Sequence, residues 1–198
     1  MRNEAPHPEL SSLLSKFDAA GGVLDYVFLK RMEMATPQLF HRAAALAATA
    51  EIDRRLERWA IEKSSAKHPI QNFFRLHWDE ATLTGKQISV STFWGTDNVE
   101  LKQTGPSSWS IPTVDGYKTA FFHPPYGLQG SASANAELFA AINRYVLGAE
   151  LKDAEIFSWS TDWSNYFDAG NEWWGAFYWT IRPIDSEWIV AVGASSTD

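Results

Sequence analysis

The spacing of apolar residues predicts two N-terminal helices with a short strand between them. Apolar side chains recur every three or four positions over about residues 8–20, which predicts a helix there. The run from Val23 to Leu29 is rich in β-branched and aromatic residues, so we expect a strand, although a buried helical turn would have the same composition. Thr36 as N-cap and Pro37 at the first helical position predict a long helix that ends near Lys63.

After residue 64, short apolar runs alternate with segments rich in Pro, Gly, Ser and Thr, a pattern typical of β-structure. Asp115-Gly116 is a hairpin turn signal, so we expect a strand over residues 117–122. Helical periodicity over residues 134–147 predicts one further helix, with Ser133 or Asn135 as its N-cap.

The C-terminal quarter is predicted to end in an antiparallel hairpin. A strand near residues 156–159 and a polar, aromatic loop over residues 160–171 precede the two hairpin strands, at residues 172–181 and 188–194. Large rings occupy both alternating faces of the first hairpin strand. We therefore expect a helix to cover one face of this strand and the loop to cover the other.

These elements predict an α+β fold in a single domain that spans residues 1–198. An N-terminal helical layer over residues 1–64 is followed by a β-rich core over residues 65–198, in which one helix packs on a mainly antiparallel sheet. The apolar content of 45% is that of an ordinary globular protein.

The net charge of −7 comes from the C-terminal quarter of the chain. Residues 150–198 contain nine acidic and two basic residues, a difference of −7, whereas residues 1–149 contain fifteen of each. Six of the ten tryptophans also lie in this quarter, within residues 159–188. Carboxylates attract cations, and aromatic rings offer stacking and cation–π surfaces, so we expect function here first.

The composition excludes several classes of function. The chain has no cysteine, which removes disulfides, thiol catalysis and Cys-ligated metals. The acidic balance argues against nucleic-acid binding, which needs Lys and Arg to neutralise phosphates. No apolar segment approaches the ~20 residues that span a bilayer, and the N-terminus lacks a secretory signal, so we expect a cytoplasmic protein away from membranes. No cofactor is expected, because no cofactor-binding motif is present.

The five histidines lack the spacing of a metal-binding motif, and no metal is predicted. A metal site would have to be assembled from distant residues, with His77, Asp79 and His123 as the best candidates.

The segment from His123 to Gly127 reads His-Pro-Pro-Tyr-Gly. It resembles the Asn/Asp-Pro-Pro-Tyr motif of amino-methyltransferases, in which a polar residue and an aromatic ring grip a flipped base. The segment departs from that motif at its first residue, and no Gly-rich cofactor loop accompanies it. We therefore interpret these residues as a rigid Pro-Pro turn.

The loop over residues 160–172 is the main candidate site, because it places three carboxylates among aromatic rings. Asp168 and Glu172 flank Gly170, whose flexibility would aim both carboxylates outward as an acid–base pair, with His123 as a third candidate catalytic residue. Asp162 is expected to accept backbone N–H bonds inside the loop. The candidate binding residues are Trp163, Tyr166, Asp168, Glu172, Trp173, Trp174 and Tyr178. The alternative is that turn chemistry explains the polar residues while the rings fill the core.

The leading functional hypothesis is a binding protein of the inhibitor or immunity type, whose acidic, aromatic C-terminal surface meets a basic protein or a cationic small ligand. The second is a hydrolase with its acid–base residues in an aromatic-lined cleft, where apolar walls separate the pKa values of two carboxyl groups. The third is a small-molecule module that stacks a sugar or a base on Trp174 or Tyr178. Binding protein and enzyme therefore both remain as hypotheses.

Overall fold

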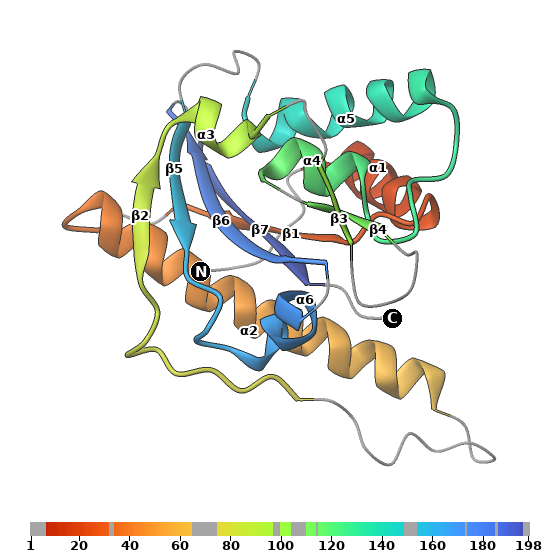
Figure 1. Cartoon of the computed structure of the whole chain (residues 1–198). Coiled ribbons are helices and arrows are strands. Elements are labelled where there is room, and N and C mark those ends of the chain that lie inside the picture. Colours follow the sequence, from red (N-terminus) through yellow and green to blue (C-terminus); the bar gives the residue numbers. More distant parts are fainter. Residues whose placement is uncertain are drawn as a thin grey trace.

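A five-stranded antiparallel sheet lies between two layers of helices in the computed structural model of the chain (Figure 1). The structure describes residues 7–31, 34–64, 75–96, 100–103, 110–113, 115–148, 154–172, 174–184 and 186–195. The strand order is β1-β7-β6-β5-β2, so strands from both ends of the chain share one sheet. Its members are β1 (Leu24–Lys30), β2 (Gly85–Ile88), β5 (Ala154–Trp159), β6 (Ala176–Pro183) and β7 (Trp188–Ser195). A separate antiparallel pair consists of β3 (Glu100–Gln103) and β4 (Ser110–Thr113).

Helices cover both faces of the large sheet. One face packs on α2 (Pro37–Lys63) and on the short helix η1 (Asn165–Phe167), which leads into α6 (Asp168–Glu172). The other face packs on α1 (Pro8–Ala19), α3 (Val90–Trp94), α4 (Tyr117–Phe122) and α5 (Ala132–Val146) (Figure 1). The predicted start of the long helix is confirmed, because Thr36 Oγ1 accepts a hydrogen bond from the Leu39 N–H at 3.3 Å.

Alternate residues of the strands pack on the two helical layers. In β6, Trp179 and Ile181 belong to the core with α1 and α3–α5, whereas Tyr178 belongs to the core with α2. Trp163 and Phe167, from the segment before β6, join that second core. The prediction that a helix and the loop cover the two faces of this aromatic strand is confirmed, although α2 shares the second face with the loop.

The α+β class and the antiparallel β6–β7 hairpin are confirmed, but the N-terminal helices do not form one layer. The predicted strand between them exists as β1, which pairs with β7 from Leu24↔Ala194 to Lys30↔Trp188 at the edge of the sheet. The strand β1 is part of the sheet, and α1 before it and α2 after it pack on opposite faces of that sheet.

The predicted strand over residues 117–122 is wrong, because this segment is the helix α4. Tyr117, Ala120 and Phe121 are fully buried, and their spacing of three and four residues places them on one side of a helix. The Asp115-Gly116 turn signal and the apolar run after it favoured a strand, but the burial of this helical face decides the local structure.

Two other boundaries differ from the prediction. Ser131 is the N-cap of α5, where its Oγ accepts from the Ala134 N–H at 3.2 Å, in place of Ser133 or Asn135. The predicted loop over residues 160–171 contains η1 and most of α6.

Candidate functional site

The aromatic rings of the predicted site are largely buried. Trp163, Trp174 and Tyr178 are 2%, 4% and 1% exposed. Trp174 Nε1 donates to the His123 carbonyl at 3.0 Å, and the Tyr178 hydroxyl donates to the Ala45 carbonyl at 2.7 Å. Neither Trp174 nor Tyr178 therefore offers an open face on which a sugar or a base would stack.

The candidate acid–base residues lie on the surface. Asp168 and Glu172 are the first and last residues of α6, and both are exposed, as is His123 at the end of α4. Gly170 between them is buried, and a Cβ there would lie 2.3 Å from the carbonyl oxygen of Gly175. Close approach to the backbone requires this glycine, so the flexible turn inferred from the sequence is wrong.

The structural role expected of Asp162 belongs to its neighbours. Ser164 Oγ accepts from the Tyr166 N–H at 3.2 Å, and the Asn165 N–H donates to the His77 carbonyl at 3.1 Å. Asn165 Oδ1 in turn accepts from the His77 N–H at 2.7 Å. The expectation for Asp162 is wrong, because no hydrogen bond to its carboxylate is found within the described residues and the Asn165 N–H donates to His77 instead.

The remaining predicted residues do not gather into a site. Trp173 lies outside the described residues. In the segment that resembles the methyltransferase motif, the Gly127 N–H donates to the Pro124 carbonyl at 2.9 Å, which is a turn. Over the part of the chain that the structure describes, no group of three or more His, Asp or Glu side chains is arranged to hold a metal ion. Within the same residues, no helix has the length and apolar character needed to cross a membrane.

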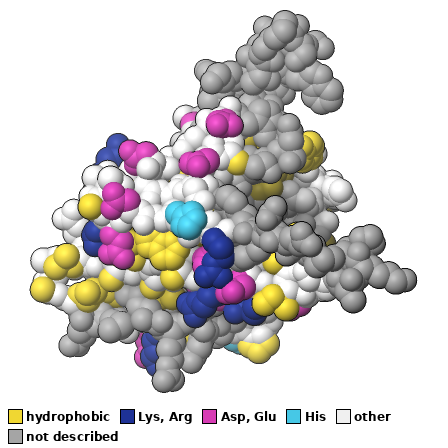
Figure 2. Space-filling model, turned by 90° about the horizontal axis from the view of Figure 1, so that it is seen from below, with side chains coloured by type: hydrophobic (Ala, Val, Ile, Leu, Met, Phe, Trp, Pro, Cys, Tyr) yellow, Lys and Arg dark blue, Asp and Glu magenta, His cyan; other side chains and the backbone are white. Residues whose placement is uncertain are grey.

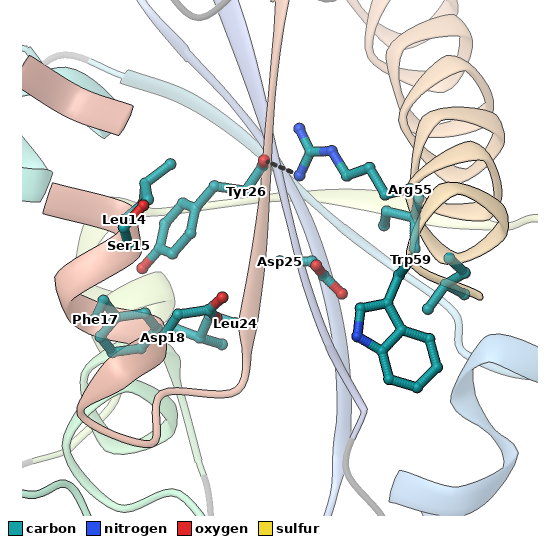
Figure 3. Close-up of a pocket in the computed structure, with 11 residues that line it drawn as sticks. Leu14, Ser15, Phe17, Asp18, Leu24, Asp25, Tyr26, Arg55 and Trp59 are labelled. Atoms are coloured by element: carbon teal, nitrogen blue, oxygen red, sulfur yellow. Dashed lines mark hydrogen bonds between the residues drawn. The ribbon is translucent and has the colours of Figure 1, made fainter. Parts of the chain in front are cut away.

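A cleft of about 410 Å³ lies between α1 and α2 at the outer edge of β1 (Figure 3). Three elements line it: α1 with Leu14, Ser15, Phe17 and Asp18, β1 with Leu24, Asp25 and Tyr26, and α2 with Ile52, Arg55, Leu56 and Trp59. The described part of these walls is therefore mainly apolar and aromatic, with three charged side chains.

Alternate residues of β1 point their backbone N–H and C=O groups toward this cleft. The Arg31 N–H donates to the Glu187 carbonyl at 2.7 Å. The backbone N–H and C=O groups of the odd-numbered residues therefore point toward β7, and those of the even-numbered residues point outward. On the outward side, the Tyr26 carbonyl accepts a hydrogen bond from Arg55 Nη1 at 2.9 Å (Figure 3). Arg55 thus occupies one position of an edge that would otherwise be open for strand pairing.

Asp25 places a carboxylate in a strand that is otherwise apolar up to Lys30 at its end, and its side chain points toward the α2 side of the cleft (Figure 3). The hydroxyl of Tyr166, from η1, donates to Asp25 Oδ2 at 2.7 Å. Gly193 of β7 is the cross-strand partner of Asp25, and a Cβ there would lie 3.2 Å from the Tyr166 hydroxyl oxygen. A glycine at this position leaves room for the phenol to reach the carboxylate.

Burial raises the pKa of Asp25 above its ordinary value of 3.8. The hydrogen bond from Tyr166 and the positive charge of Arg55 lower this pKa in part, while the nearby Asp18 carboxylate adds to the rise. The two carboxylates that share a cavity are therefore Asp18 and Asp25, not the predicted pair on α6. A carboxylate with a raised pKa on the wall of a cleft marks a candidate functional site.

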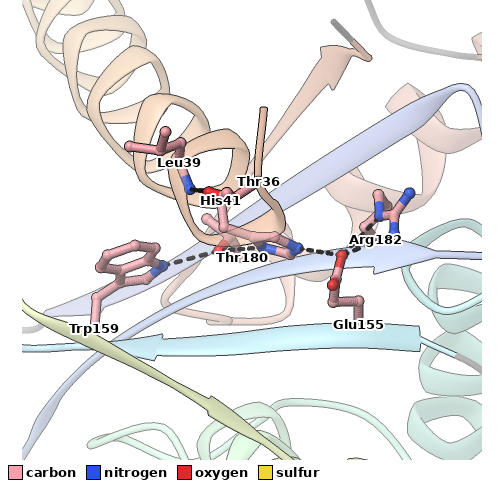
Figure 4. A network of polar contacts seen from close by, with 7 residues as sticks. All are labelled: Thr36, Leu39, His41, Glu155, Trp159, Thr180 and Arg182. Atoms are coloured by element: carbon pink, nitrogen blue, oxygen red, sulfur yellow. Dashed lines mark hydrogen bonds and ion pairs between the residues drawn. The ribbon is translucent and has the colours of Figure 1, made fainter. Parts of the chain in front are cut away.

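A second polar cluster is buried between α2 and the sheet (Figure 4). His41 Nδ1 lies 2.8 Å from Thr180 Oγ1, and His41 Nε2 lies 3.2 Å from Glu155 Oε2. Trp159 Nε1 donates to Thr180 Oγ1 at 2.9 Å, and Arg182 Nε donates to Glu155 Oε2 at 2.9 Å. Burial lowers the pKa of His41 from 6.5 to about 4, although the Glu155 carboxylate acts against this. Since the members of this cluster bond to one another and lie outside the cleft, we assign them a structural role.

The sequence contains signals for the cleft that its overall pattern conceals. Asp25 is the one acidic residue in the run from Val23 to Leu29, and Gly193 interrupts the β-rich run from residue 188 to residue 194. An isolated glycine in a strand often marks the close approach of another group. Arg55 resembles the other charged residues on the outer side of its helix, and only the fold brings it to β1.

Comparisons with protein-family models, with curated proteins and with solved structures find no match to this chain. The class of the protein therefore rests on its own fold and site. It is a three-layer α+β protein with a ligand-sized cleft at the outer edge of its sheet.

Proposed function

We propose that this is a binding protein that holds a small organic ligand in the cleft between α1 and α2. The observation that carries the proposal is the position of Asp25, whose partly buried carboxylate lines the cleft beside Trp59. A charged group in such a place loses part of its hydration, which costs stability. A ligand that pairs with the carboxylate offsets that cost and fills the apolar space around it.

The size and chemistry of the cleft support this proposal. Its volume of about 410 Å³ falls within the range of roughly 300–1,000 Å³ that is usual for small-molecule pockets. A few polar groups among apolar walls are also typical of such pockets. Trp59 is 57% exposed, unlike the buried tryptophans of the C-terminal quarter, and a large exposed ring on the wall of a cleft is available for recognition.

A panel of small organic compounds tests the proposal by thermal shift and by tryptophan fluorescence. We expect some of them to raise the melting temperature and to compete for one site. Ser15→Trp, which fills the cleft from α1, should abolish their binding. Ser11→Trp, one helical turn earlier on the same helix and outside the cleft lining, is the matched control and should retain it. The proposal fails if no compound depends on the cleft in this way.

A second candidate function is the binding of a basic protein. The observation that favours it is a group of exposed carboxylates. The Asp79 N–H donates to the Trp163 carbonyl at 2.8 Å, which brings Asp79 and Glu80 beside the C-terminal loop. The exposed acids here are Asp79, Glu80, Asp162, Asp168 and Glu172, and no ion pair to them is found within the described residues. Figure 2 shows acidic side chains in several places on the lower face of the molecule, some of them next to Lys or Arg side chains.

Binding of poly-lysine at low and at high salt tests this second function. We expect the triple variant Asp162→Asn, Asp168→Asn, Glu172→Gln to bind more weakly at low salt, because unpaired surface charges accelerate association with an opposite charge. Glu137→Gln on α5 is the control for the loss of one exposed acid. Equal binding by the triple variant and the unmodified protein would rule out this surface.

A further inference from the structure

We infer that the ligand of the α1–α2 cleft is a small organic cation, with an ammonium-type group carried on an apolar body. This inference rests on the proposed function of the cleft and names the class of ligand that it binds. It follows from the charges on the cleft wall, from the position of Trp59 and from the apolar surface on the α1 side.

The charged side chains of the cleft leave an excess of negative charge. Among the described residues, Asp18 and Asp25 both line it, and Arg55 is the single cation that does so. Arg55 already has partners, since Nη1 donates to the Tyr26 carbonyl at 2.9 Å and Nε lies 3.5 Å from Glu51 Oε1. A ligand therefore meets two carboxylates whose charge the wall offsets only in part.

The other arginines near this end of α2 do not reverse that balance. Arg54 and Arg58 pair with Glu51, and their side chains are 58% and 60% exposed. Neither lines the cleft. Water screens exposed charges strongly, so these two act weakly on a ligand held against β1.

Asp25 has acceptor capacity to spare. A carboxylate has about four acceptor positions, and the hydrogen bond found for it within the described residues comes from Tyr166. An ammonium group donates up to three hydrogen bonds and accepts none, so it matches this carboxylate. A ligand carboxylate would meet Asp18 and Asp25 as like charges.

Trp59 lies on the same side of the cleft as the Asp25 carboxylate. Figure 3 shows its indole ring on the same side of β1 as Asp25, on the wall formed by α2. A cation that lies over an indole face is attracted by the ring quadrupole. On the α1 side of β1, Phe17, Leu24 and Leu14 provide an apolar surface for the body of the ligand.

Three probes with the same apolar body and different charge test the inference by calorimetry. At neutral pH, phenethylamine is a cation, phenethyl alcohol is neutral and hydrocinnamate is an anion. We expect the affinity for phenethylamine to be higher than that for the alcohol by about tenfold or more, because the ammonium group forms a charge-assisted hydrogen bond. We expect hydrocinnamate to bind most weakly of the three.

Variants assign this selectivity to single residues. Asp25→Asn keeps the size of the side chain and an acceptor for Tyr166, and it should weaken phenethylamine binding by about tenfold or more. Trp59→Leu should weaken it by about two- to fivefold, as expected for a partly exposed cation–π contact. Glu137→Gln, an acid-to-amide change on the exposed side of α5, should leave binding unchanged. If Asp25→Asn does not fold, Asp18→Asn at the exposed end of α1 replaces it, with a smaller expected loss.

The outcomes separate this inference from the proposed function. If the alcohol or hydrocinnamate binds as tightly as the amine, or if Asp25→Asn and Asp18→Asn leave amine affinity unchanged, the cationic class is wrong while the cleft remains a binding site. If none of the three probes binds, the cationic class is also wrong. The proposed function itself fails only if the compound panel yields no ligand that Ser15→Trp excludes.

Discussion

Asp25 and His41 are two polar side chains that the fold places inside apolar layers, and they differ in how their hydrogen-bonding capacity is used. Both nitrogens of His41 have partners at hydrogen-bonding distance within its cluster. Asp25 accepts from Tyr166 and faces a cleft. A fully bonded buried group holds the structure together, whereas a carboxylate with unused acceptor positions beside a cavity is available to a ligand. This difference is the reason to place binding at Asp25.

The lowered pKa of His41 predicts that acid destabilises the protein through this residue. Between about 6.5 and about 4, the unfolded chain binds a proton at His41 that the folded protein excludes. The free energy of unfolding should therefore fall as the pH falls through this range. In His41→Gln, which cannot take up that proton, the fall should be less steep.

Urea unfolding of His41→Gln at a series of pH values measures this effect. His77→Gln is the matched control, because His77 is exposed and only its backbone takes part in the contacts described above. If His41→Gln and the unmodified protein lose stability equally across the range, the buried imidazole is not the group responsible.

At the scale of elements, ring-to-ring contacts hold the helices of one layer together. Phe139 of α5 packs against Tyr117, Phe121 and Phe122 of α4, with ring centroids 5.8, 4.8 and 4.8 Å apart, and against Trp94 of α3 at 5.5 Å. Each such pair adds a specific geometry to the burial of apolar area. Phe139 thus links three helices, although it is itself only half-buried.

We predict that Phe139→Ala lowers the free energy of unfolding by about 2–3 kcal/mol, less than the roughly 3–5 kcal/mol of a fully buried phenylalanine. The loss comes from the removed apolar contacts and from the space left between α4 and α5. Chemical denaturation measures it, with the exposed Arg144→Ala on the same helix as the control. A loss below about 1 kcal/mol would mean that this ring does not join the helices.

Several elements could be predicted because their periodicity is unambiguous. The long helix has a Thr-Pro start and a sustained helical pattern, and the β6–β7 hairpin has two apolar runs separated by a short polar turn. At residues 117–122 the sequence predicts a strand, because the Asp115-Gly116 turn signal and a short apolar run outweigh a spacing of three and four in only six residues. The helical structure of this segment depends on burial in a core that only the complete fold provides.

At the scale of the whole molecule, the two ends of the chain complete the same sheet. β7 lies between β1 and β6 and pairs with both, over seven and six residue pairs. Removing it would separate β1 from the sheet and expose the rings of β6 along an unpaired edge. We therefore expect residues 1–198 to unfold as a single domain.

A chain that ends at Trp188 tests this expectation, because it lacks the rest of β7. We predict that it does not unfold cooperatively, whereas the full chain shows one transition that is the same by circular dichroism and by tryptophan fluorescence. A shortened chain with a cooperative transition, or a full chain with two transitions, would contradict a single domain.

The cleft is formed by side chains of several elements, so no local sequence pattern predicts it. Asp18, Asp25, Arg55 and Tyr166 come from four elements, and the last of these is more than 100 positions from the others. The acidic C-terminal quarter is conspicuous in the sequence because its charges are neighbours there, yet its tryptophans lie largely in the core. A site assembled across a sheet leaves only isolated signals along the chain, such as one acid in an apolar strand.

A crystal structure of the full chain grown with phenethylamine tests the central claim most directly. We predict that the ligand lies between α1 and α2, with its ammonium nitrogen within hydrogen-bonding distance of the Asp25 carboxylate and its phenyl ring against the apolar wall of α1. An empty cleft at a phenethylamine concentration that saturates binding in solution, or the ligand bound at another surface, would contradict the account.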